Sequence, residues 1–148
     1  DISRDEPTIE SIEDTITYFD SVSDAVEQID EPILCFQNDV AELDEICMDS
    51  NPIEGMYLAS SYLLHDGIKV TIEQSWGSKH EENIVMNPMR ETISILLDNG
   101  MVIDGVYSSS DSAFVGAAVT PYTVIRICVE NIHETDAIQE LLNNLTMN

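Results

Sequence analysis

The clearest hydrophobic pattern along this chain is the alternation of apolar and polar residues after residue 55. In residues 68–76, Ile68, Val70 and Ile72 alternate with polar residues, as in a strand that buries one face. The preceding segment, 56–64, is joined to it by a His-Asp-Gly turn, so the two predict a β-hairpin. Similar patterns predict a second hairpin in residues 91–107, around an Asp-Asn-Gly turn, and strands at 113–119 and 122–130.

The N-terminal part of the chain is open to two interpretations. Apolar residues from Ile9 to Ile29 are spaced by three or four, which would form one long amphipathic helix. Residues 15–19 are rich in strand-forming residues, however, and Ser21 can cap a helix that follows them. We therefore predict a strand at 15–19 and a helix at 22–30.

Three further elements are predicted from shorter patterns. The compact apolar run at 33–37 indicates a buried strand. Residues 38–49 are predicted to form a helix, because their apolar residues have the spacing of one helix face. These apolar residues are Val40, Leu43, Ile46 and Cys47. A C-terminal helix is predicted at 134–145, with Thr135 as its N-cap.

The predicted elements run βαβα, then several mostly antiparallel strands, then a helix. This order favours an α+β fold in which two or three helices, including a C-terminal helix, pack against a mostly antiparallel sheet. We expect residues 1–148 to form a single acidic domain. A separate unit that ended near residue 50 would bury too little apolar surface to be stable.

The charge of the chain is far from that of an ordinary domain. It has 29 Asp and Glu against five Lys and Arg, a formal net charge of −24. From residue 5 to residue 66 there are seventeen acidic residues and no Lys or Arg. Residues 1–54 hold 17 acids and one Arg (−16), whereas residues 55–148 hold 12 acids and four cations (−8). Because this field repels nucleic acids and anionic membranes, we expect a basic or nucleic-acid-binding protein as partner.

Catalytic, cofactor and metal motifs are not evident in the sequence. His80 and His133 stand beside carboxylates, but neighbouring residues on a loop rarely give the ligand geometry that zinc or iron requires. The three cysteines lie in apolar runs and include no C-x-x-C pair, which indicates buried, reduced thiols. We therefore expect a cytoplasmic protein that is not an enzyme, with no catalytic residues, no cofactor and no bound metal.

Two hypotheses explain the acidity. In the first, the chain is a non-catalytic interaction protein that binds a basic groove on its partner, as a nucleic-acid-mimic inhibitor or an immunity or anti-defence type protein. The partner-binding residues predicted for this role are Asp24, Glu27, Asp30, Glu31, Glu42 and Glu45. In the second, it is a halophile-adapted cytoplasmic domain of archaeal or viral origin, whose acids only maintain solvation and whose function is regulatory or structural.

Overall fold

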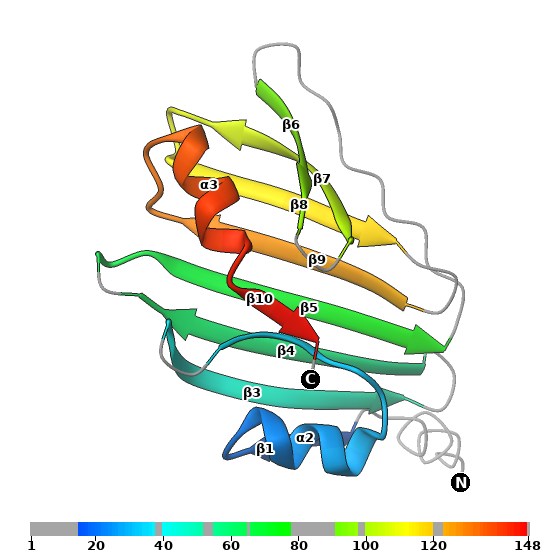
Figure 1. Cartoon of the computed structure of the whole chain (residues 1–148). Helices are drawn as coiled ribbons and strands as arrows, with labels where there is room; N and C mark the ends of the chain where they lie inside the picture. Colours follow the sequence, from blue (N-terminus) through cyan, green and yellow to red (C-terminus); the bar gives the residue numbers. More distant parts are fainter. Residues whose placement is uncertain are drawn as a thin grey trace, which may run out of the picture.

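The computed structural model describes residues 15–37, 40–51, 55–64, 66–77, 91–97, 100–119 and 123–147. Within these ranges the chain forms ten strands and two helices (Figure 1). The strands are β1 (Thr15–Phe19), β2 (Leu34–Phe36), β3 (Glu42–Asn51), β4 (Gly55–Leu63), β5 (Lys69–Gly77), β6 (Glu91–Leu96), β7 (Val102–Ser108), β8 (Ala113–Val119), β9 (Thr123–Glu130) and β10 (Leu145–Met147). The helices are α2 (Val22–Ile29) and α3 (Thr135–Leu142).

Eight of the strands form one antiparallel sheet in the order β1-β3-β4-β5-β9-β8-β7-β6. One half of this sheet is an N-terminal block, made of β1, β3, β4 and β5, and the other half is a C-terminal block, made of β6 to β9. The two blocks meet where β5 pairs with β9. Strands β2 and β10 form a separate antiparallel ribbon, in which Leu34 lies opposite Met147 and Phe36 opposite Leu145. This ribbon connects the N-terminal block to the C-terminal end of the described chain.

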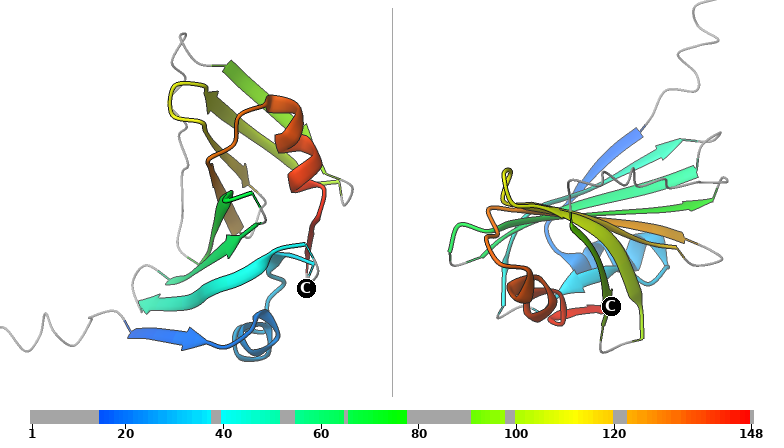
Figure 2. Two further views of the ribbon diagram at one scale, coloured as in Figure 1. Left: turned by 90° about the vertical axis from the view of Figure 1, so that its left-hand side faces the viewer. Right: turned by 90° about the horizontal axis from the view of Figure 1, so that it is seen from above.

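Both helices and the β2–β10 ribbon lie on the same side of the large sheet. The view from above in Figure 2 shows them on one side, which we call the inner face; no described helix covers the other side, which we call the outer face. Side chains alternate between the two faces along each strand. In β4, for example, Leu58 and Tyr62 are buried on the inner face, whereas Tyr57 and Leu63 are exposed on the outer face.

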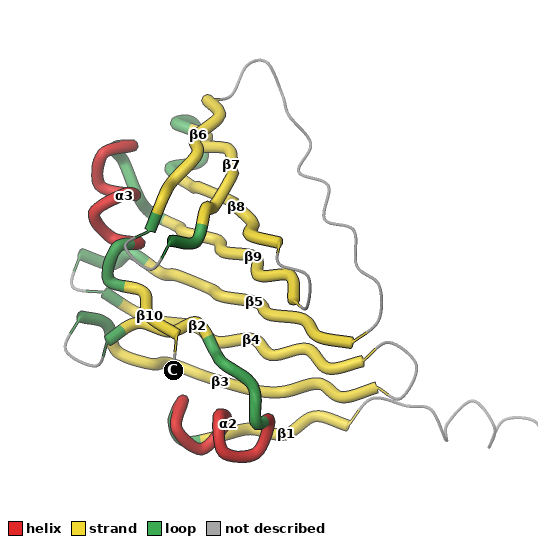
Figure 3. The backbone as a smooth tube through the Cα atoms, turned by 45° about the vertical axis from the view of Figure 1, so that its right-hand side comes forward, coloured by secondary structure: helices red, strands yellow, loops and turns green. Residues whose placement is uncertain are grey.

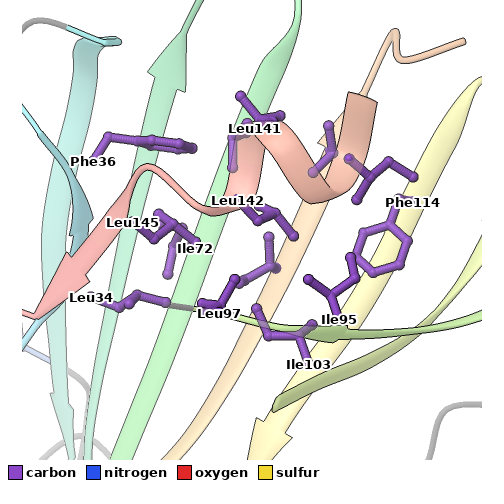
Figure 4. Packing of buried hydrophobic residues seen from close by; sticks show 14 of the residues in the cluster. Leu34, Phe36, Ile72, Ile95, Leu97, Ile103, Phe114, Leu141, Leu142 and Leu145 are labelled. Atoms are coloured by element: carbon purple, nitrogen blue, oxygen red, sulfur yellow. The ribbon is translucent and has the colours of Figure 1, made fainter. Parts of the chain in front are cut away.

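The main hydrophobic core lies between the inner face, α3 and the ribbon. The sheet contributes Ile72, Ile95, Ile103 and Phe114, and the C-terminal elements contribute Leu141, Leu142 and Leu145 (Figure 4). Ile103, Phe114 and Leu142 are completely buried. Burying a side chain of this size contributes about 1.5–3 kcal/mol. An eight-residue helix is marginal by itself in water, so this apolar contact is what stabilises α3.

A second cluster lies under α2 and consists of Ala25, Ile33, Ile46, Met48, Leu58 and Trp76. Close to it, the side chain of Gln74 on β5 is buried on the inner face. Its Oε1 accepts a hydrogen bond from the Leu34 N–H (3.1 Å), and its Nε2 donates to the Pro32 carbonyl (3.0 Å). One amide side chain thereby fixes the beginning of β2 against the sheet.

The described structure agrees with the predicted fold class at a coarse level, since it is mostly antiparallel sheet with two helices, one of them C-terminal. The predicted strand at 15–19 is β1, and the helix after it is α2. Ser21 is its N-cap as predicted, because its Oγ accepts from the Asp24 N–H at 3.1 Å. The N-cap of α3 is Glu134 instead of Thr135, and its side chain makes no capping hydrogen bond.

The predicted helix at 38–49 is wrong. Residues 42–51 form β3, a strand that is paired on both sides, with β1 and with β4 (Figure 3). Ile46 and Met48 are buried on the inner face, while Cys47 between them points outward. The same apolar residues fit either a helix or a strand, and pairing with β1 and with the next strand, β4, decided between them.

Candidate partner-binding surface

Helix α2 presents the first group of predicted partner-binding residues. Ala25 is completely buried, so the opposite side of the helix faces solvent, and Asp24 and Glu27 are both exposed there. Asp24 lies in the first turn, where the positive end of the helix dipole favours a carboxylate. The helix thus presents these two carboxylates to solvent, while Ala25 packs into the core.

The other two predicted residues of this region, Asp30 and Glu31, lie at the C-terminal end of α2 and are both exposed. Asp30 is the C-cap and adopts a left-handed conformation (φ 62°, ψ 37°), with its N–H bonded to the Val26 carbonyl. The last turn of α2 contains no basic residue. Because the C-terminal end of a helix carries partial negative charge, both carboxylates stand where the local field disfavours them.

Glu42 and Glu45 lie on β3 and not on a second acidic helix. Glu42 is opposite Leu63 and Glu45 is opposite Ser61, with a bulge in the register between Leu43 and Glu45. Both glutamates are exposed and project from the outer face. The structure therefore divides the six predicted residues between two sides: four on or beside α2, on the inner side of the sheet, and two on the outer face.

The charge asymmetry of the sequence becomes an asymmetry in space. Strands β1, β3 and β4 form one end of the large sheet, and α2 packs against that end. The described part of residues 15–63 has nine acidic residues and no Lys or Arg; the acids are Asp20, Asp24, Glu27, Asp30, Glu31, Glu42, Asp44, Glu45 and Asp49. We call this the acidic end. The described cations, Lys69 and Arg126, lie on β5 and β9 in the middle of the sheet.

A polar group marks the boundary of the acidic end on the outer face. The Tyr57 hydroxyl donates a 2.5 Å hydrogen bond to Oε2 of Glu73, and Arg126 is the cross-strand neighbour of Glu73. Burial, together with the hydrogen bond to Glu73, raises the pKa of Tyr57 above its usual range. Tyr57 therefore stays neutral at physiological pH, and the guanidinium stands beside a carboxylate that is already hydrogen-bonded.

The apolar side chains on the outer face were not predicted from the sequence. Five of the eight exposed large apolar residues fall in one row across the strands; they are Leu96, Val102, Val119, Tyr57 and Ile16. Val119 is 65% exposed and Leu96 63%. The available signal was β8, whose sequence AFVGAAV is apolar on both faces instead of alternating. A partner on the outer face would meet both carboxylates and apolar surface.

Most of the aromatic residues do not belong to this surface. Tyr62, Trp76 and Tyr107 are buried on the inner face, and Tyr107 donates a hydrogen bond to the Ile132 carbonyl at 3.1 Å. Tyr57 and Tyr18 are the described tyrosines that reach the outer surface, 38% and 67% exposed. Interface energies are often dominated by tyrosine, so these two are the aromatic candidates for contact.

The chemical groups that could support catalysis are unfavourably placed within the described residues. Burial raises the pKa of the thiols of Cys35, Cys47 and Cys128, which lowers the thiolate fraction that reacts. His133 is exposed, and its Nδ1 lies 3.1 Å from Oγ of Ser112. In the part of the chain that the structure describes, no three His, Cys, Asp or Glu residues gather where they could hold a metal ion. The candidate His80 falls outside that part.

Comparisons with known proteins do not extend these observations. No family model, no curated protein and no solved structure matches the chain. Neither of the two described helices is long and apolar enough to cross a membrane. The surface of the described molecule is therefore the feature that bears on its function.

Proposed function

We propose that this protein acts without catalysis, by binding a basic groove on a partner protein in the manner of a nucleic-acid-mimic inhibitor or an immunity or anti-defence protein. The observation that carries the proposal is the acidic end, where nine described carboxylates occur with no Lys or Arg between them. Ordinary acidic surfaces include cations that offset part of the repulsion. A surface that omits them has a uniformly negative field, which steers and holds a basic partner.

The position of individual carboxylates supports this proposal. Asp30 and Glu31 stand at the negative end of α2, and Glu42 and Glu45 are both exposed on the outer face of β3. The helix end disfavours the first pair, and a basic partner would offset the repulsion within both pairs. Nucleic-acid-binding grooves supply such cations, because a duplex carries one phosphate charge per about 1.7 Å of its axis and the groove neutralises several of these charges.

The two groups of carboxylates also suggest how a partner would approach. Those of α2 and those of β3 lie on opposite sides of the sheet but at the same end, next to the edge strand β1. A groove that contacted all six residues would therefore enclose that end of the molecule. A duplex likewise presents its phosphates in two rows on a narrow body.

The test neutralises the six predicted residues together, as Asp24→Asn, Glu27→Gln, Asp30→Asn, Glu31→Gln, Glu42→Gln and Glu45→Gln. A matched control changes net charge equally in the rest of the chain: Asp66→Asn, Glu81→Gln, Glu82→Gln, Asp98→Asn, Glu130→Gln and Glu134→Gln. The partner is isolated on the wild-type chain, and calorimetry then measures affinity at several salt concentrations, with and without competing duplex DNA.

The six-residue variant is expected to bind at least about tenfold more weakly than wild type and to show a smaller salt dependence, because surface charges govern both quantities. The control should bind within about threefold of wild type. Duplex DNA should displace the chain from its partner. Equal losses in the two variants would mean that net charge, and not the acidic end, drives binding, which contradicts the proposal.

A further inference from the structure

Strand β6 is an edge of the large sheet, and one hydrogen bond shows which of its backbone groups face the free side. Among the described strands it pairs with β7 alone and ends the strand order. Nε2 of Gln139 on α3 donates to the Leu96 carbonyl at 3.1 Å, so this carbonyl points away from β7. Because backbone groups of alternate residues point to the same side of a strand, the N–H and C=O of Ser94 face the free edge too.

Helix α3 lies beside this edge (Figure 1). It forms the second wall of a groove. The groove has a volume of about 710 Å³ and is lined by residues 92–95 of β6. Its other wall is formed by Thr135, Asp136, Gln139 and Glu140 of α3 and by the C-cap residue Asn143. The contact between Gln139 and Leu96 joins the two walls near one end. An edge strand flanked by a helix is the arrangement in which proteins accept an extended peptide as an added strand.

Three of the features that often prevent such pairing are absent from β6. Natural edge strands are protected by Lys, by Pro, by a bulge or by a covering helix or loop; α3 lies beside this edge and bonds to its backbone through the Gln139 side chain. The sequence of β6, ETISIL, has neither residue, and its register with β7 runs without a shift from Glu91 to Leu96. Its backbone is therefore regular and able to pair with a further strand.

The charge of the groove selects the occupant. Asp136 and Glu140 are exposed on the helix wall, and none of the described residues that line the groove is Lys or Arg. A second copy of this chain would bring another net charge of −24 to the same place, which disfavours pairing of two copies through β6. On the outer side of the edge the neighbouring side chain is Leu96, which is apolar and exposed.

We propose that β6 and α3 bind an extended, lysine-bearing peptide segment of a partner protein, which adds to the sheet as a ninth strand. The peptide backbone pairs with Ser94, and Gln139 releases the Leu96 carbonyl to it. Alternate side chains of the peptide point to the two sides of the new strand. Lysines on one side reach Asp136 and Glu140, and apolar residues on the other side cover Leu96. The site is separate from the acidic end and does not require the function proposed above.

The probe is the fluorescein-labelled peptide Lys-Val-Lys-Val-Lys-Val, and its binding is measured by fluorescence anisotropy. The matched peptide with every backbone nitrogen methylated has the same side chains and cannot donate strand hydrogen bonds. The protein variants are Ser94→Pro, which removes an edge N–H without breaking the β6–β7 pairing, and Ser94→Ala, which retains it. Both lose the hydroxyl that donates to Oδ1 of Asp104, so the loss of that bond does not distinguish them. Thermal unfolding establishes that each variant folds.

Wild type and Ser94→Ala are expected to bind the probe alike, whereas Ser94→Pro should bind at least about tenfold more weakly. If Ser94→Pro does not fold, the double variant Asp136→Lys with Glu140→Lys replaces it and should lose the probe to the same extent. The methylated peptide should not bind.

Binding of the methylated peptide, equal binding by all variants, or no binding of the probe at millimolar concentration each overturns the proposal. The six-residue variant of the acidic end should bind this probe within about threefold of wild type, which distinguishes failure here from failure of the proposed function.

Discussion

At the scale of one residue, Asp30 combines a backbone conformation and a charge that both disfavour its position at the end of α2. Its φ of 62° is a conformation that glycine and asparagine adopt most readily at a helix end. Its carboxylate stands at the negative end of α2, where a basic residue would be favoured. Glycine would satisfy the backbone better, and lysine the dipole. An aspartate in this position fits a surface on which negative charge is used for binding.

Two substitutions that remove one negative charge each should change stability in opposite directions. Asp30→Gly should raise the free energy of unfolding by about 0.5–1 kcal/mol, because it relieves the left-handed conformation and the repulsion at the helix end. Asp24→Asn should lower it by a few tenths of a kcal/mol, because it removes a favourable charge at the helix start. Urea unfolding measures both, and a rise for both variants would show that net charge alone controls stability.

At the scale of elements, the sequence predicted those that depend on local pattern. The cap at Ser21 was predictable because its partner, Asp24, is three residues away. Strands β4 and β5 were predictable because alternation and a turn lie within one short segment. The strand β3 was mistaken for a helix because its pairing with β1 and β4 is not visible in its own residues. Strand β10 was missed because three residues carry little pattern and their partner, β2, is over one hundred residues away.

The hydrogen bonds of Gln74 hold the beginning of β2 against β5, and a substitution can measure what they contribute. Gln74→Met keeps the shape of the side chain but leaves the Leu34 N–H and the Pro32 carbonyl without their partner inside the protein. The loss of both bonds should cost about 2–4 kcal/mol, which urea unfolding measures. Exchange of the Leu34 amide hydrogen should accelerate at the same time. The control is Gln28→Met on the exposed side of α2, which should change stability by less than about 0.5 kcal/mol.

At the scale of the whole molecule, the sequence predicted the sign and the imbalance of charge but not its distribution over faces. The acidic half of the chain became one end of the sheet because β1, β3 and β4 pair with one another. The exposure of Asp24 and Glu27 followed from the helical pattern of α2. The outward direction of Glu42 and Glu45 could not be predicted, since it depends on a strand register and on the bulge beside Leu43.

Salt dependence separates recognition from halophilic adaptation. We expect the purified chain to unfold cooperatively at 0.1 M NaCl, where charges more than about 10 Å apart are already screened. Higher salt should then raise the midpoint of urea unfolding only gradually. Circular dichroism during denaturation in 0.1–3 M NaCl measures this, with sucrose as an uncharged control. A chain that folds only in molar salt would favour the alternative, in which the acids serve solvation.

The pairing of β2 with β10 joins two segments that the ribosome produces at different times. Leu145 enters the core opposite Phe36, so β2 is synthesised more than one hundred residues before the strand that completes its ribbon. The N-terminal strands of the sheet can pair earlier, but the apolar inner face stays uncovered until β10 has been made. Pairing over so long a stretch of sequence is slow, and the uncovered face is the surface through which a growing chain would aggregate.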